Sequence, residues 1–159
     1  MNNQPILLVE DDENDILLMQ FAMKRAGTTN PLYVVRDGQE AIEYLEGAGE
    51  FVDRIQFPFP SLVLLDLKLP RKSGLEVLRW IRQEAGLETL PVVVLTSSTL
   101  DRDFEQVHRL GANSCLSKPT TPDQQVDLVR KLDSYWFNRT HPAPDRMGTE
   151  IPRPPFESD

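Results

Sequence analysis

The sequence has little cysteine and no long apolar run, and each shortage excludes a class of protein. Cys115 is the only cysteine, so no disulfide can form within the chain, which suits a reducing compartment. Apolar runs such as ILLV and LVLL reach no more than four or five residues, whereas a bilayer-spanning helix needs roughly 20. The first residues, MNNQPILLVEDD, lack the basic start of a secretion signal. We therefore expect a cytoplasmic protein without a membrane-spanning segment.

Basic residues are scarce relative to acidic ones. The chain has 17 Lys and Arg against 25 Asp and Glu, which gives a formal net charge of −8. Proteins that bind nucleic acids neutralise phosphates with Lys and Arg, so we do not expect direct binding of DNA or RNA. The 159 residues can enclose one sizeable core but hardly two. We expect one folded domain over residues 1–137, followed by a proline-rich, extended tail over residues 138–159.

The pattern of apolar residues predicts an α/β fold. Short β-branched or leucine-rich runs alternate with longer helical segments, which is typical of βαβ units and a parallel sheet. The runs LVLLD and VVVLT show no polar alternation, as expected for strands covered on both faces. The expected strands are residues 6–10, 32–36, 62–66, 92–96 and 114–117. The expected helices are residues 13–26, 38–46, 74–85, 100–110 and 122–137.

Two further patterns concern the connections between these elements. The pairs Asp37 with Glu40 and Ser73 with Glu76 each fit a capping box at the start of a helix. Residues 47–60 are longer than an ordinary αβ connection of roughly two to six residues. The phenylalanines expected to attach this segment to the domain are Phe51, Phe57 and Phe59.

Polar side chains stand at the carboxyl ends of four expected strands. Glu10 and Asp11 come at the end of the first strand, and Asp66 ends the third. Thr96 ends the fourth, and Lys118 follows the fifth. Ligands of open parallel sheets bind beyond these ends. We therefore expect the five side chains to share one rim of the sheet.

This group of side chains predicts a divalent metal site that supports phosphoryl transfer. Two like charges about 4 Å apart repel by roughly 4 kcal/mol at an effective dielectric near 20, so clustered carboxylates require a cation. Oxygen-rich, partly open sites suit Mg²⁺, which shares its shell with waters and phosphate oxygens. A carboxylate beside the ion can attack a phosphoryl group, and Asp66, at the end of the most apolar strand, is the strongest candidate. Lys118 and Thr96 would bind the phosphoryl oxygens.

Simpler interpretations stay open for each residue taken alone. Acids before a helix often act only as caps and dipole partners, and this is the favoured interpretation of Asp12. Thr96 alone could be an ordinary strand residue, and Lys118 alone a solvated loop charge. Only their joint position at the strand ends favours a site.

The motifs resemble those of bacterial response-regulator receiver domains over about residues 5–137. They are LLVEDDEND for the acidic pair, LVLLDLKLPRKSGLEVLRWIR for the phospho-acceptor region, PVVVLTSS for the hydroxyl and GANSCLSKP for the lysine. The resemblance implies a flavodoxin-like, doubly wound sheet of five parallel strands in the order 2-1-3-4-5, flanked by five helices.

The resemblance also implies a role for each residue at the rim. Asp66 would accept a phosphoryl group from a histidine kinase, and Asp11 and Asp66 would ligate Mg²⁺ directly. Glu10 would act mainly through a bound water, and the main-chain carbonyl of Lys68 would complete the protein ligands. The protein would catalyse only its own phosphorylation and dephosphorylation, so it would be a signalling phospho-acceptor and not an enzyme in the ordinary sense.

Further implied features concern the switch between signalling states. Thr96 would reorient on phosphorylation, and the peptide bond after Lys118 would be cis. The family usually has an aromatic residue three positions before the lysine, where this chain has Cys115. Lys68 and Ser98 occupy positions that influence the phosphoryl lifetime in the family.

The partners are predicted from the same resemblance. The long connection after the second helix and the sequence TSSTLDRD resemble the corresponding segments of single-domain receivers that partner bacterial phytochrome kinases. We expect such a histidine kinase as the input, and a homodimer through the segment from Leu100 to Phe137. One apolar stripe of the last helix suffices to face the sheet. A second stripe, formed by Leu128, Leu132 and Tyr135, could face a partner or belong to a broad core-facing surface.

Two functions from other classes stay open as alternatives. A phosphatase with an aspartyl nucleophile would show a second acid two residues after it, where this chain has Lys68. A phosphorylation-independent protein-binding module would keep the fold without using the rim.

Overall fold

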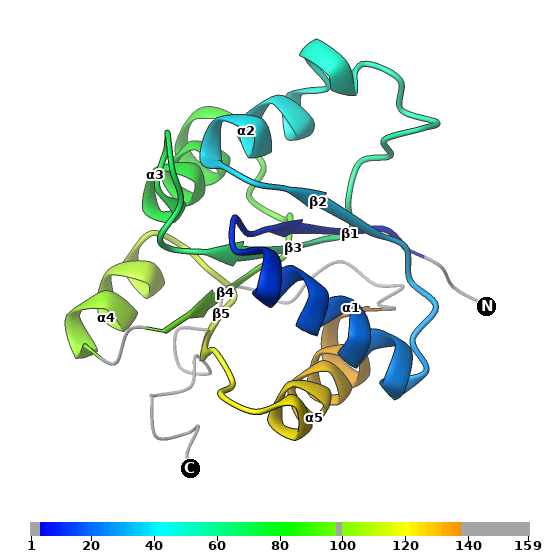
Figure 1. The fold of residues 1–159 in the computed structure, drawn as a ribbon. Coiled ribbons are helices and arrows are strands. Elements are labelled where there is room, and N and C mark those ends of the chain that lie inside the picture. Colours follow the sequence, from blue (N-terminus) through cyan, green and yellow to red (C-terminus); the bar gives the residue numbers. More distant parts are fainter. Residues whose placement is uncertain (1–3, 98–99, 138–159) are drawn as a thin grey trace.

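The computed structural model describes residues 4–97 and 100–137, which form a parallel sheet with helices on both faces (Figure 1). The strands are β1 (Ile6–Val9), β2 (Leu32–Val35), β3 (Leu62–Asp66), β4 (Val92–Thr96) and β5 (Ser114–Ser117). They lie in the order β2-β1-β3-β4-β5, and every neighbouring pair is parallel. The predicted α/β class and strand order are confirmed.

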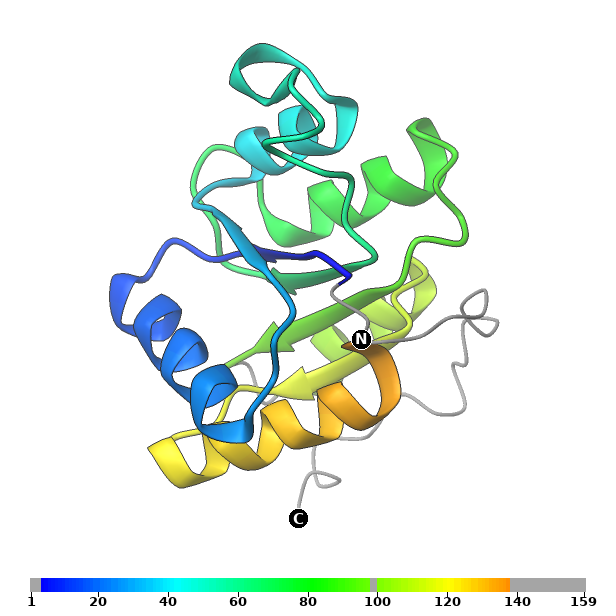
Figure 2. The same ribbon diagram turned by 90° about the vertical axis from the view of Figure 1, so that its right-hand side faces the viewer.

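Helices alternate with the strands and cover both faces of the sheet. The α-helices are α1 (Glu13–Ala26), α2 (Gly38–Glu46), α3 (Gly74–Arg79), α4 (Asp101–Arg109) and α5 (Pro122–Leu132). The shorter helical turns are η1 (Gly49–Phe51), η2 (Trp80–Glu84) and η3 (Asp133–Phe137). Figures 1 and 2 show α1 and α5 on one face of the sheet and α2 and α3 on the other.

Two apolar clusters hold the helices to the sheet. Leu7 and Val9 of β1 pack in one cluster with residues of α2, α3 and α4. Ile6 and Leu8, which alternate with them, pack in the other cluster with residues of α1 and α5. All the residues of β1, β3 and β4 are buried, which explains why these strands are apolar up to the polar residues that end β3 and β4, Asp66 and Thr96.

The predicted elements differ from the structure mainly at their ends. β1 and β2 each end one residue earlier than predicted. The N–H of Glu10 still donates to the carbonyl of Val35 (3.0 Å), so Glu10 continues the line of β1. The predicted helix 74–85 is α3 followed by the π-helical turn η2, in which the N–H of Ala85 donates to the carbonyl of Trp80 (2.8 Å). The helix predicted over residues 122–137 divides in the same way into α5 and η3.

Side-chain caps fix where two of the helices begin. The N–H of Ser73 donates to Glu76 Oε1 (2.8 Å), and the N–H of Glu76 donates to Ser73 Oγ (3.2 Å), so the predicted capping box of Ser73 and Glu76 is confirmed. Asp37 caps α2 by accepting the N–H of Glu40 (2.8 Å). Glu40 accepts the N–H of Arg36 (2.9 Å), which lies just past the edge strand β2. The predicted capping box of Asp37 and Glu40 is therefore only half formed.

The long connection after α2 is attached by stacked aromatic rings. The rings of Phe51 and Phe57 lie 5.1 Å apart, and each packs against the ring of Tyr44 at 5.0 and 6.1 Å. Phe59 does not join them, because its side chain is 42% exposed. The guanidinium of Arg54 lies 5.6 Å from the Tyr44 ring centroid and 5.7 Å from the Phe59 ring centroid, so it contacts both rings.

The second apolar stripe of the last helix faces inward. Leu128 and Leu132 are 8% and 1% exposed and pack in the cluster that includes α1. Only Tyr135 is exposed. Figure 1 shows α5 beside α1, so α5 packs against both the sheet and a neighbouring helix. The burial of Leu128 and Leu132 favours the interpretation as a broad core-facing surface.

Two sequence predictions concern residues that the structure does not describe and the absence of a membrane-spanning helix. The predicted tail, residues 138–159, and Ser98 lie outside the described residues. Within the described part of the chain, no helix has both the length and the apolarity needed to cross a bilayer.

Arg82 joins three segments although it is charged and only 8% exposed. Its Nε donates to the carbonyl of Gly111 (2.9 Å), its Nη1 to the carbonyl of Leu87 (2.6 Å) and its Nη2 to Asn113 Oδ1 (2.8 Å). The same Asn113 oxygen accepts the N–H of Val92 (2.9 Å). One side chain therefore holds the end of η2 to the starts of β4 and β5.

Arg82→Ala should lower the free energy of unfolding by about 3 kcal/mol, because several buried acceptors lose their donor. Urea denaturation measures the change. Arg79→Ala removes the same type of side chain from an exposed position in α3, and it should change the free energy by less than about 0.5 kcal/mol. Equal losses in the two variants would contradict the role of Arg82.

Candidate functional site

The parallel register brings the predicted residues to one rim of the sheet. β1 and β3 pair up to the residues just before Glu10 and Asp66, so these two acids are neighbours across the strands. β4 lies next to β3 and ends at Thr96, whose carbonyl accepts the N–H of Lys118 (2.8 Å). Residues far apart in the chain therefore meet at the carboxyl ends of the strands, as predicted.

Glu10, Asp11 and Asp66 form an acidic cluster at this rim. One carboxylate oxygen of each lies within 4.8 Å of the other two. Glu10 and Asp66 are 4% and 7% exposed, whereas Asp11 is exposed to solvent. Oxygens bound to one Mg²⁺ at about 2.1 Å lie about 3 to 4 Å apart, so shifts of about 1 Å would bring all three onto one ion. The three carboxylates fit a small divalent cation.

Lys118 supplies the counter-charge of this cluster. Its Nζ lies 2.9 Å from Glu10 Oε1, 3.0 Å from Asp15 Oδ2 and 3.3 Å from Asp66 Oδ2. These contacts join the end of β5 to the ends of β1 and β3 and to α1. The contact of Asp15 with Lys118 was not predicted from the sequence. The available signal was an acid in the first turn of a helix that begins at this rim.

The surroundings of these groups shift two of their pKa values. Burial raises the pKa of Glu10 to about 7; the hydrogen bond from Lys118 acts against this shift, and the charge of Asp66 adds to it. Burial lowers the pKa of Lys118, but its hydrogen bonds to Glu10 and Asp15 outweigh burial and raise the pKa overall. Lys118 is therefore protonated at neutral pH, whereas Glu10 changes its charge there.

Thr96 and Cys115 lie on the strands next to the acidic cluster. Thr96, the last residue of β4, is 2% exposed. Cys115 is fully buried and packs in the same cluster as Phe104 and Val107 of α4. The residue that replaces the usual aromatic of the family is therefore part of the core beneath α4.

The peptide bond between Lys118 and Pro119 is trans. Among the described residues, no peptide bond is cis, so the prediction of a cis bond at this position is wrong for this structure. A proline peptide favours the trans form by about 0.5 to 1 kcal/mol unless its surroundings select cis.

The loop after β3 approaches other backbone so closely that two positions require glycine. A Cβ on Gly74 would lie 2.1 Å from the main-chain oxygen of Asp66, and a Cβ on Gly38 would lie 2.0 Å from that of Lys72. These glycines let the loop that carries Lys68 pack against the starts of α2 and α3. The Lys68 side chain is exposed, and the role of its carbonyl as a metal ligand stays a prediction.

Arg71 also attaches the loop after β3 to α2. Its φ of 66° lies in the left-handed region, which non-glycine residues seldom adopt. Its Nε lies 3.1 Å from Oδ2 of Asp37, the N-cap residue of α2. The loop after Asp66 is therefore attached to α2 by an ion pair in addition to the close packing at Gly38.

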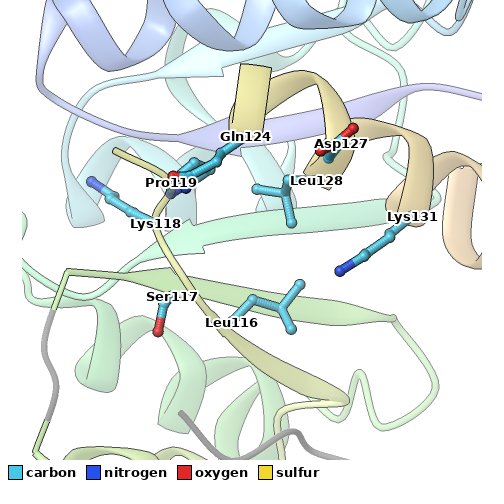
Figure 3. A pocket seen from close by; sticks show the side chains of 8 residues that line it. All are labelled: Leu116, Ser117, Lys118, Pro119, Gln124, Asp127, Leu128 and Lys131. Atoms are coloured by element: carbon cyan, nitrogen blue, oxygen red, sulfur yellow. The ribbon is translucent and has the colours of Figure 1, made fainter. Parts of the chain in front are cut away.

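A groove lies beside Lys118, between β5 and α5 (Figure 3). Its volume is about 310 Å³. The residues that line it are Leu116, Ser117, Lys118, Pro119, Gln124, Asp127, Leu128 and Lys131. Because β5 is the last strand in the sheet order, the groove runs along the edge of the sheet.

Comparison with known proteins shows relatives over most of the chain. Residues 6–130 match the family described as the response regulator receiver domain. The response regulator Rcp1 of Synechocystis sp. is 38% identical over 132 residues, which cover 83% of this chain and 88% of Rcp1. The probable methanogenesis regulatory protein FilR2 of Methanothrix harundinacea is 39% identical over 144 residues, which cover 87% of this chain and 88% of FilR2.

Solved structures of relatives share the fold. The phosphorylated cyanobacterial phytochrome response regulator RcpA has a TM-score of 0.79 at 34% identity, covering 88% of this chain and 98% of RcpA. The Mn²⁺-bound form of Rcp1 has a TM-score of 0.77 at 35% identity, covering 89% of this chain and 99% of Rcp1. One relative is thus known in a phosphorylated form and another with a divalent metal.

In the metal-free protein, the free energy of unfolding should fall as the pH rises from about 5 to about 8. Folded Glu10 keeps its proton up to a pKa of about 7, whereas the unfolded chain releases it near the ordinary value of 4.5. The folded state holds more protons in this window, so a rising pH favours the unfolded state. Urea denaturation at several pH values measures the fall, which should be smaller in Glu10→Gln. An equal fall in both proteins would contradict the assignment.

Proposed function

The chain belongs to the family of response regulator receiver domains, and from this premise we propose that Asp66 is its phospho-acceptor. A histidine kinase donates the phosphoryl group, and the protein signals through contacts with other proteins. It catalyses only its own phosphorylation and dephosphorylation. The observation that carries the proposal is the convergence of three carboxylates and the Lys118 ammonium at one rim of the sheet.

The contacts of Asp66 support its proposed role as the nucleophile. Its carboxylate ends β3 beside two other acids, and Lys118 Nζ lies 3.3 Å from its Oδ2. An Asp66 oxygen attacks the phosphorus of the kinase phosphohistidine, the P–N bond breaks, and the imidazole leaves, so that an acyl phosphate forms. Lys118 then binds one equatorial phosphoryl oxygen, and the Thr96 hydroxyl binds another.

The acidic cluster would hold Mg²⁺ during this reaction. Asp11 and Asp66 would bind it directly, Glu10 mainly through a water, and the main-chain carbonyl of Lys68 would complete the protein ligands. An all-oxygen donor set with one exposed member suits Mg²⁺, which retains several waters. When bound, the ion offsets the negative charge of the carboxylates and the phosphoryl oxygens.

The two alternative functions fit the rim less well. A phosphatase with an aspartyl nucleophile would have an acid two residues after Asp66, and Lys68 stands there. A phosphorylation-independent binding module would have no use for two buried carboxylates side by side. Because burying like charges together is unfavourable, Glu10 and Asp66 are better explained by a reaction that needs them.

A phytochrome-type histidine kinase in the cytoplasm is the proposed input. RcpA, described as a cyanobacterial phytochrome response regulator, shares 34% identity with this chain over 98% of its own length. FilR2, at 39% identity, is named for methanogenesis, so relatives of this chain are named for more than one process. The long connection after α2 and the amino-acid sequence of the segment after β4 favour a phytochrome-type kinase as the partner.

The protein is also proposed to form a homodimer through the segment from Leu100 to Phe137. This segment contains α4, β5 and α5, and it includes the edge strand and the groove beside it (Figure 3). Asp127 and Lys131 of α5 carry opposite charges at this groove. In a two-fold dimer, Asp127 of one copy can face Lys131 of the other, so the same pair forms twice.

Asp66→Asn should abolish labelling of the protein by acetyl phosphate and Mg²⁺, because the amide cannot replace the carboxylate as nucleophile. Intact-mass spectrometry before and after acid treatment measures the labile phosphoryl group. Asp123→Asn makes the same change at an exposed position of α5 and should label like the wild type. Undiminished labelling of Asp66→Asn would remove the assignment.

Sedimentation should show a dimer at protein concentrations on the order of tens of micromolar in the presence of beryllofluoride. Lys131→Glu should weaken the dimer by about tenfold, because two carboxylates would then face each other across the two-fold axis. The double variant Asp127→Lys with Lys131→Glu exchanges the charges and should restore the dimer. A monomer in every condition, or a double variant as weak as Lys131→Glu, would contradict the proposed interface.

A further inference from the structure

Asp15 contacts the lysine of the site from a helix that supplies none of the predicted metal ligands. It lies in the first turn of α1, and its Oδ2 is 3.0 Å from Lys118 Nζ. It lies outside the acidic cluster formed by Glu10, Asp11 and Asp66. Its side chain is 38% exposed, so the carboxylate stays partly hydrated while it holds the ammonium. Lys118 therefore has one ionic partner that is not needed for the metal.

Lys118 and a divalent cation compete for two of the same carboxylates. Glu10 and Asp66, at 2.9 and 3.3 Å from Nζ, are two of the three carboxylates that converge. An ammonium between them would also repel a doubly charged ion beside it. The lysine must therefore loosen these two contacts when the metal binds, and it must stay close enough to reach a phosphoryl group on Asp66.

We propose that Asp15 is a positioning residue that holds the Lys118 ammonium to one side of the acidic cluster, so that a divalent cation can bind there. A cavity of about 20 Å³, lined in part by Glu10, Asp15 and Lys118, borders this contact. Such a volume is about that of one water position, which is enough for the ammonium to shift toward α1. The inference rests on the proposed metal site and function.

The neighbouring acids of α1 show that this contact is not a general property of the first turn. Glu13 also lies in that turn, but it pairs with Arg36 on the surface (2.7 Å). The cap is supplied by Asp12, whose Oδ1 accepts the N–H of Asp15 (3.3 Å). The Asp15 side chain is therefore not needed to begin the helix. What distinguishes it is its ion pair with Lys118.

Calorimetric titration of the full chain with MgCl₂ tests this role without any phosphodonor. Asp15→Asn should raise the apparent Kd for Mg²⁺ by about three- to tenfold, because Lys118 then pairs only with Glu10 and Asp66. Asp12→Asn removes an equal charge from the same helix end and keeps the cap, so its Kd should change by less than about twofold. Equal rises in the two variants would reflect net charge alone and would overturn the inference.

Lys118→Met provides the second test, because it removes the ammonium that Asp15 is proposed to hold. In that background, Asp15→Asn should change the Kd for Mg²⁺ by less than about twofold. A full three- to tenfold rise there would overturn the inference, since Asp15 would then act without the lysine. If Lys118→Met fails to fold in a thermal melt, the comparison of Asp15→Asn with Asp12→Asn decides alone.

The outcomes separate this inference from the function on which it rests. If the wild type binds no Mg²⁺, the proposed function fails and the role of Asp15 fails with it. If the wild type binds Mg²⁺ and Asp15→Asn binds it equally well, only the role of Asp15 is overturned.

Discussion

The structure depends on the ion pairs that Lys118 makes with acids from three different elements. Glu10 and Asp66 are buried side by side at the ends of β1 and β3, and buried charges without a partner are strongly destabilising. The ammonium at 2.9 and 3.3 Å offsets part of that cost. One positive charge cannot balance three converging carboxylates, so the rim still attracts a divalent cation.

Residues at the amino ends of β4 and β5 stabilise the fold, whereas residues at the carboxyl ends of the strands form the candidate functional site. At the amino ends of β4 and β5, Arg82 and Asn113 satisfy one another and the nearby main chain with short hydrogen bonds. At the carboxyl ends, like charges are gathered and only partly compensated. The loop after Asp66 is held in place by close packing at Gly38 and Gly74, so the acidic rim does not itself have to order the loop.

The sequence alone was sufficient to predict the strands and the residues at the rim, because both follow from local patterns. Buried parallel strands are apolar along most of their length, and residues at their carboxyl ends must meet, which placed Glu10, Asp66 and Lys118 together. The ion pair of Asp15 depends on a side chain 103 positions away, and no local pattern marks it. The inward position of Leu128 depends on how α5 packs against α1 and the sheet. These features arise from tertiary contacts between elements.

The central claim is that carboxylates from two strand ends bind one divalent ion at the rim where we propose that Asp66 is phosphorylated. Anomalous diffraction from crystals of this protein soaked in Mn²⁺ tests it most directly. The account predicts a single strong peak at the rim, within about 2 Å of carboxylate oxygens of Asp11 and Asp66. A protein that binds Mn²⁺ elsewhere, with no peak between these two side chains, would contradict it.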